Sequence, residues 1–95
     1  MTEIINIIKR EMSNPELSVE LIADEYGVSR TYLNRKIKAI TGDTTLKFIR
    51  NIRFKYAAQL LQSGEKNVSE TAWEIGYNDV NTFRLRFKEM FGVTP

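Results

Sequence analysis

The sequence predicts an all-α domain in which two helix-turn-helix units are joined by a long central helix, with an extra N-terminal helix. Three observations predict this fold class. Apolar residues recur at spacings of three and four, only two Pro and five Gly interrupt the 95 residues, and one short sequence unit occurs twice. A chain of this length has room for a single domain, residues 1–95, and we expect it to contain one hydrophobic core.

Start and stop signals divide the chain into six helices. Ser18 and Ser29 are typical N-cap residues for the second and third helices. Asn14-Pro15 closes the first helix, and glycines close the others. The expected spans are about Thr2–Met12, Ser18–Gly27, Ser29–Ile40, Thr45–Ser63, Val68–Ile75 and Asp79–Phe91.

Apolar residues spaced by three and four define the face that each helix buries. In the longest helix they trace one stripe along its length. The expected buried residues are Ile4, Ile5, Ile7 and Ile8 of the first helix; Leu33, Ile37 and Ile40 of the third; Leu46, Ile49, Ile52, Tyr56, Ala57, Leu60 and Leu61 of the longest; and Phe83, Phe87, Met90 and Phe91 of the last.

The repeated unit is a short helix, a tight turn and a second helix. Ala23 and Gly27 match Ala72 and Gly76 at an offset of 49 residues, and the following helices match at an offset of 50. The pattern is typical of a helix-turn-helix, because Ala permits close helix crossing and Gly can adopt the positive φ of the turn. We expect the first unit over about residues 18–42, the linker helix over 45–63 and the second unit over 67–92. The pairs matched at an offset of 50 are Leu33–Phe83, Ile37–Phe87, Lys38–Lys88 and Gly42–Gly92.

The composition excludes most catalytic chemistry. The chain has no Cys and no His, which removes disulfides, thiol nucleophiles and the commonest general base and metal ligands. We therefore expect no enzyme activity, catalytic residue, metal or cofactor. No apolar stretch approaches the roughly 20 residues of a membrane span and no signal peptide is evident, so we expect a cytoplasmic chain without membrane contact.

Charge is unevenly distributed, although the net charge is only +2. Residues 1–28 carry six acidic and two basic side chains, whereas residues 29–56 carry eight basic and one acidic. The last twelve residues are basic again, with three bases against one acid. Two interpretations remain open: an ordinary solvated surface, or two patches that face an anion.

The second helix of a helix-turn-helix is the one that enters the DNA major groove. At 100° per residue, Thr31, Arg35 and Lys38 lie opposite the buried face of the third helix, with Asn34 at their margin. Arg can bond guanine, Asn can bond adenine and Thr can contact a thymine methyl group, so these side chains are suitable for reading bases. The corresponding residues of the last helix are Asn81, Leu85 and Lys88, flanked by Arg84, and Leu85 is suited to a thymine methyl group.

The linker helix has a geometric role. Its length of about 19 residues spans about 28 Å, close to the roughly 34 Å between successive major grooves on one face of B-DNA. Lys47 and Arg50 of this helix are candidates for phosphate contacts, as are the free N–H groups that follow Ser29. We expect Arg53 to be tied instead to a carboxylate such as Glu70, as an internal brace.

A series of motifs extends from Leu17 to Pro95. It includes Leu21-Ile22-Ala23 through Gly27-Val28-Ser29, Tyr32-Leu33, Phe48-Ile49, Leu60-Leu61, Ala72 through Gly76-Tyr77, Phe83 through Phe87-Lys88, and Phe91-Gly92-Val93-Thr94-Pro95. These motifs resemble the DNA-binding domain of the AraC/XylS family of bacterial transcription regulators. The resemblance implies two helix-turn-helix units that bind successive major grooves of promoter DNA as a monomer, and activation through contact with RNA polymerase. With it, the base-reading candidates are Thr31, Asn34, Arg35, Val80, Asn81, Arg84 and Leu85, and the phosphate-binding candidates are Ser29, Arg30, Lys38, Lys47, Arg50, Arg86 and Lys88.

Two positions depart from the family pattern. Leu85 stands where the family usually has Arg, and Thr45 stands where it often has Pro. The family also implies a sensory or dimerisation domain in the parent protein, so we expect the chain to be an excised domain. The alternative function is a helical protein-interaction module without DNA binding, which would use Leu85, Trp73 or the acidic first helix to hold another protein.

Overall fold

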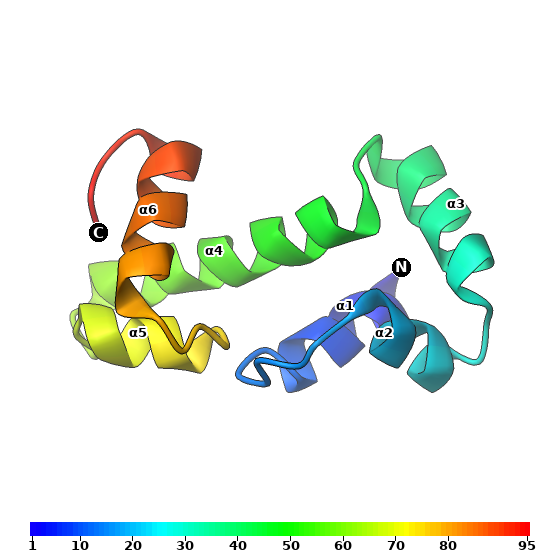
Figure 1. The fold of residues 1–95 in the computed structure, drawn as a ribbon, viewed down its shortest axis with the longest axis horizontal. Coiled ribbons are helices and arrows are strands. Elements are labelled where there is room, and N and C mark those ends of the chain that lie inside the picture. Colours follow the sequence, from blue (N-terminus) through cyan, green and yellow to red (C-terminus); the bar gives the residue numbers. More distant parts are fainter.

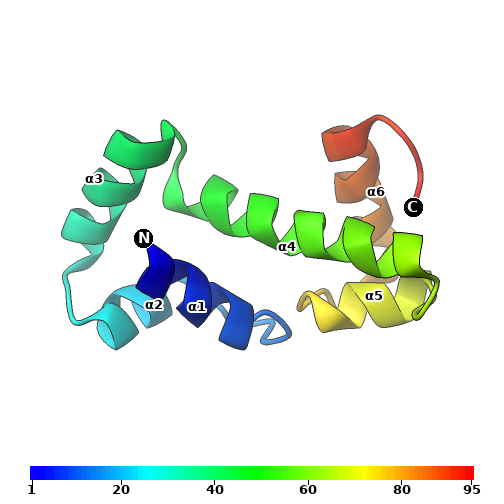
Figure 2. The same cartoon turned by 180° about the vertical axis from the view of Figure 1, so that it is seen from behind.

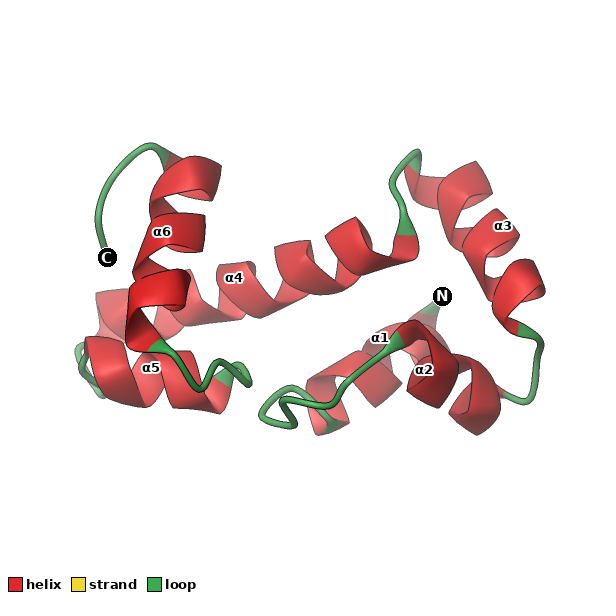
Figure 3. Ribbon diagram, in the orientation of Figure 1, coloured by secondary structure: helices red, strands yellow, loops and turns green.

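The computed structural model describes residues 1–95 and consists of six α-helices. Their bounds are α1 Thr2–Arg10, α2 Val19–Tyr26, α3 Arg30–Thr41, α4 Thr45–Ser63, α5 Val68–Glu74 and α6 Val80–Phe91. Helix α4 runs along the molecule, which measures 37 × 22 × 21 Å, and α3 and α6 stand at its opposite ends (Figures 1 and 2). Loops alone join the helices (Figure 3), so the predicted all-α class is confirmed. No helix has both the length and the apolar content needed to cross a membrane.

Side-chain caps determine where the helices begin. Ser18 and Ser29 accept the backbone N–H of the residue three positions later, each at 3.1 Å, as the sequence predicts. Thr44 caps α4 in the same way at 3.2 Å, which leaves Thr45 as the first helical residue. Asp79 caps α6 by accepting the N–H of Asn81 at 2.9 Å.

The two helix-turn-helix units have the same local geometry. In the first unit, the residue after Gly27 donates its N–H to the carbonyl of Ala23 at 3.0 Å. In the second unit, the residue after Gly76 donates its N–H to the carbonyl of Ala72 at 2.9 Å. Helices α3 and α6 each contain 12 residues and are closed by Gly42 and Gly92, so the offset of 50 holds along their whole length. The repeat in the sequence is therefore a repeat in the structure.

The chain buries two apolar clusters, so the prediction of a single core is wrong. Helices α1, α2 and α3 pack on the N-terminal half of α4, and α5 and α6 pack on its C-terminal half, so each end of the molecule has its own core. Ile52 of α4 contacts both clusters. The first consists of Ile4, Ile7, Ile8, Val19, Ile22, Ala23, Leu33, Ile37 and Ile49; the second consists of Met12, Phe54, Ala57, Ala72, Ile75, Phe83 and Phe87.

Phe54, which is not in the apolar stripe predicted for the longest helix, is fully buried at the centre of the second cluster. Its ring stacks on Phe83 with centroids 5.5 Å apart and meets Tyr77 edge-on at 5.4 Å. Met12, expected at the end of the first helix, follows the end of α1 and packs into this same cluster. Phe54 escaped a single-stripe prediction because α4 buries different faces at its two ends, whereas Met12 lies in the loop after α1.

Four side chains predicted to be buried are exposed instead. Ile40, Leu46 and Phe91 lie in the last or first turns of their helices, beyond the parts that pack against neighbours. Tyr56 lies on α4 at a groove beside α1 rather than in a core. Their exposed fractions are 56% for Ile40, 62% for Leu46, 38% for Tyr56 and 38% for Phe91.

Candidate nucleic-acid interface

Helices α3 and α6 present most of the predicted base-reading residues to solvent. Both helices stand upright at the two ends of α4, with their N-termini on the same side (Figures 1 and 2). The buried residues of each helix, Leu33 and Ile37 in α3 and Phe83 and Phe87 in α6, fix which face remains free. The side chains on the free faces are Thr31, Asn34 and Arg35 in α3, and Asn81, Arg84 and Leu85 in α6.

Val80 differs from the other candidates because it is half-buried and packs against the second cluster. Leu85, by contrast, is 57% exposed. The free face of α6 therefore combines an amide, a guanidinium and one apolar side chain.

Asn34 has a partner that the sequence did not reveal. Its Oδ1 accepts a hydrogen bond from the Thr45 hydroxyl at 2.6 Å, and Thr45 is only 2% exposed. The bond joins α3 to the first turn of α4 and satisfies a buried hydroxyl. The Nδ2 group of Asn34 keeps its two hydrogens free.

The cations divide into those with a protein partner and those without one. Arg35 and Arg84 have neither an ion pair nor a side-chain hydrogen bond, and the same is true of Arg50 and Lys88. Three other phosphate candidates pair with acids: Arg30 with Glu20 at 2.9 Å, Arg86 with Glu89 at 3.1 Å and Lys47 with Asp43 at 3.6 Å. Such exposed pairs contribute about 0–1 kcal/mol, so a phosphate can displace them.

The ends of the two recognition helices differ electrostatically. At the start of α3 the Ser29 hydroxyl accepts the N–H of Tyr32, which leaves the neutral N-terminus open to an anion. At the start of α6 the Asp79 carboxylate holds this position, and the pKa of Asp79 is lowered by its hydrogen bonds with the Thr82 hydroxyl and the Asn81 N–H. At the other end of α3, Lys38 donates to the carbonyl of Gly42 at 2.9 Å.

A groove between α3 and α4 adds residues that the sequence analysis did not select. Arg30, Arg35 and Lys38 line one side of it. Thr44 and the exposed Leu46 line the other side, at the N-terminal turn of α4. Neither residue lies in a charged motif, so only the packing of α4 against α3 reveals them.

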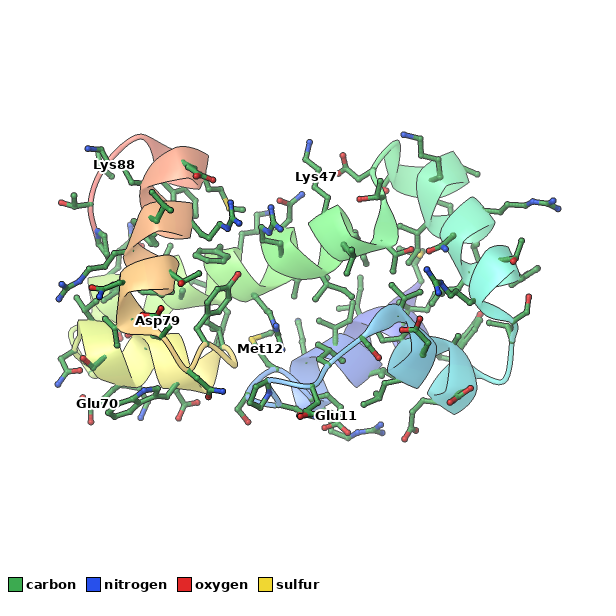
Figure 4. All side chains as sticks on the ribbon, viewed as in Figure 1. Glu11, Met12, Lys47, Glu70, Asp79 and Lys88 are labelled. Atoms are coloured by element: carbon green, nitrogen blue, oxygen red, sulfur yellow. The ribbon has the colours of Figure 1, made fainter.

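Two of the phosphate candidates lie on the side of the molecule at which α3 and α6 end. In Figure 4, Lys47 and Lys88 extend towards the upper edge, whereas Glu11 and Glu70 lie at the lower edge.

Arg53 is a brace, but the predicted partner is wrong. Its Nη2 donates to the backbone carbonyl of Asn14 at 2.7 Å. Glu70, the expected partner, instead closes a capping box with Asn67 at the start of α5. Burial lowers the pKa of the Arg53 guanidinium, and its Nε atom is buried without a partner.

The chain is similar to a known domain family and to several known proteins. The helix-turn-helix domain family matches residues 7–95. The chain is 39% identical over 89 residues to histidine kinase P4 of Formosa agariphila, which covers 94% of this chain and 6% of that protein. This chain spans 47% and 28% of the lengths of two further curated relatives, so it corresponds to only part of each of those proteins.

Two solved structures share the fold closely. The C-terminal domain of AraT, a response regulator from Geobacillus stearothermophilus, is 34% identical with a TM-score of 0.88 and covers 97% of this chain and 76% of that one. A Chromobacterium violaceum transcriptional regulator, described as containing an AraC-type DNA-binding domain, is 29% identical with a TM-score of 0.89. It covers 99% of this chain and 83% of that one.

Proposed function

The chain belongs to the AraC-type family of helix-turn-helix DNA-binding domains, and from this premise we propose that it inserts α3 and α6 into two successive major grooves of promoter DNA. One observation carries the proposal: the two recognition helices expose equivalent faces at opposite ends of one long helix. We assign residues 1–95 to one domain, with units at about 18–42 and 67–92 and the linker at 45–63. The family consists of DNA-binding domains of transcription regulators rather than enzymes.

In the first unit, Arg35 is the principal base reader. Its guanidinium is exposed and has no protein partner, so it can bond guanine O6 and N7 without first breaking a contact. Thr31, one turn earlier, is suited to a thymine methyl group. Asn34 contributes only through its Nδ2 group while its oxygen holds Thr45.

In the second unit, Asn81 and Arg84 supply the polar base contacts, with Val80 at their edge. Leu85 stands where Arg35 stands in the first unit, at the offset of 50, and offers an apolar contact to a thymine methyl group. The two units therefore read different half-sites, so the site that one domain binds is not a palindrome.

The phosphate contacts come from the cations and from one helix N-terminus. Arg50 and Lys88 are free to bind phosphate directly, whereas Arg30, Lys47 and Arg86 exchange an acidic partner for it. At the start of α3, Ser29 and the N–H groups after it add a contact. Lys38 contributes near the C-terminal end of the same helix.

The parent protein joins this domain to others. Two similar chains are parts of a histidine kinase and a response regulator, which supports a sensory or dimerisation domain in the parent. A promoter-bound domain of this kind acts with RNA polymerase, and it works in the bacterial cytoplasm, where the chromosome lies.

A binding-site selection from random duplex DNA tests this function. We expect a site with two different half-motifs about 10–10.5 base pairs apart, and an affinity that falls steeply with salt. A single motif, or binding that salt does not weaken, argues against the proposal. Chemical-shift changes on adding the selected DNA that avoid both Arg35 and Arg84 favour the protein-interaction alternative.

A further inference from the structure

The two halves of the molecule meet at one place besides the continuous helix α4. The loop between α1 and α2 faces the turn between α5 and α6 beneath the middle of α4 (Figures 1 and 2). Met12 of this loop is buried in the second cluster, although the helices on either side of it belong to the first (Figure 4). Residues before the first unit therefore pack directly on the second unit.

Arg53 lies in the middle of this junction. On α4, Arg53 lies between Ile49, which belongs to the first cluster, and Phe54, which lies at the centre of the second cluster. Its Nη2 donates to the carbonyl of Asn14 at 2.7 Å, a residue 39 positions earlier in the chain. The guanidinium is partly buried, and a charged hydrogen bond in such surroundings is stronger and more directional than one in water.

The turn of the second unit closes against the same atoms. Gly76 has a φ of +84°, and a Cβ added there would lie 2.7 Å from Arg53 Nη2, 3.0 Å from the Met12 carbonyl and 3.1 Å from the Asn14 carbonyl. The equivalent Gly27 has nothing within 4 Å of such a Cβ. The close approach is thus specific to the second unit and not a requirement of the repeated turn.

We propose that Arg53, Asn14, Met12 and Gly76 form an interunit latch, which fixes the distance and angle between α3 and α6 and thereby sets the half-site spacing that the domain accepts. The effect on DNA rests on the proposed function, whereas the effect on the distance between the helices does not. Arg53 is a positioning residue here: its partly buried guanidinium faces a backbone carbonyl and a turn, not the exposed faces of the recognition helices.

A distance measurement without DNA tests the latch itself. The chain has no Cys, so spin labels on Ala39→Cys in α3 and Glu89→Cys in α6 report only the separation of the two helices. We expect a narrow distance distribution for the otherwise unchanged chain and a broader one when Arg53→Met is added. Lys55→Met removes an exposed cation two residues further along α4 and should leave the distribution unchanged.

A spacing series on fluorescently labelled duplexes tests the consequence for recognition. One base pair inserted between the selected half-sites shifts the second by about 3.4 Å and turns it by about 35°. We expect the unchanged domain to lose about tenfold in affinity, because at least one good base contact is lost. The Arg53→Met domain should bind the optimal site more weakly but lose less than about threefold on the insertion. The Lys55→Met control should keep the tenfold penalty.

The outcomes separate the two proposals. An Arg53→Met domain that is folded by circular dichroism and keeps both the narrow distribution and the tenfold penalty overturns the latch. If that variant unfolds, Arg53→Lys decides, since it keeps the positive charge but replaces the planar guanidinium with a compact ammonium group. We expect intermediate values, and values identical to those of the unchanged chain overturn the latch. A third outcome is that the distance distribution broadens in Arg53→Met although the unchanged domain binds no duplex. This result refutes the proposed function and leaves the latch in place.

Discussion

The hydrogen bond between Asn34 and Thr45 separates a structural role from a reading role at one residue. In Asn34→Ala the Thr45 hydroxyl, 2% exposed, loses the acceptor that it holds at 2.6 Å. A buried polar group left without a partner costs about 1–3 kcal/mol of unfolding free energy. In a domain of this size each kcal/mol lowers the melting temperature by about 4–8 °C.

Thermal and urea unfolding of four proteins measure this cost. Thr45→Val removes the hydroxyl and leaves Asn34 exposed with its whole amide free, so we expect a smaller loss than in Asn34→Ala. The double variant Asn34→Ala/Thr45→Val should be more stable than the sum of the single losses implies, because no orphaned hydroxyl remains. Strictly additive losses, or an Asn34→Ala domain as stable as the unchanged one, refute the reasoning.

Further substitutions test the core, the cap and the readers. Phe54→Ala should cost about 3–5 kcal/mol of unfolding free energy, since the ring is fully buried among aromatic residues; a loss below about 1 kcal/mol in urea unfolding contradicts the two-cluster description. The pKa of Asp79 is lowered below its ordinary 3.8, so its hydrogen bonds stabilise the fold above that pH and are lost as the pH falls through the folded value. The melting temperature of Asp79→Asn should therefore fall less steeply than that of the unchanged chain as the pH drops below about 4. Equal pH dependence of the two melting temperatures argues against the cap. Arg35→Ala should relax selectivity at one base pair by about 1–3 kcal/mol, whereas Lys88→Ala should weaken all sequences alike; equal losses on every site for both variants reject Arg35 as a reader.

The fold was largely predictable because its signals are local. Ser18 and Ser29 cap the helices they were expected to cap, and the offset between the two copies located both turns. Phe54 was missed because the prediction gave the long helix one buried stripe, while its two halves bury different faces. Met12 was misplaced for a related reason, since its partners come from the opposite end of the chain.

The candidate interface was predictable only in part. Helical periodicity identified the free faces of α3 and α6, because burial of their apolar residues determines what remains outside. It did not reveal that Asn34 bonds Thr45, or that Arg53 bonds the carbonyl of Asn14. A backbone carbonyl has no signature in the sequence, and a partner 39 residues away is set by tertiary packing alone.

The central claim is that one rigid domain reads two successive major grooves of a single duplex. Methylation interference on the selected site tests it most directly, because a methyl group on guanine N7 blocks contacts in the major groove alone. The account predicts two clusters of interfering guanines on one face of the duplex, about 10–10.5 base pairs apart from centre to centre. A single cluster, or two clusters about half a turn apart on opposite faces, contradicts it.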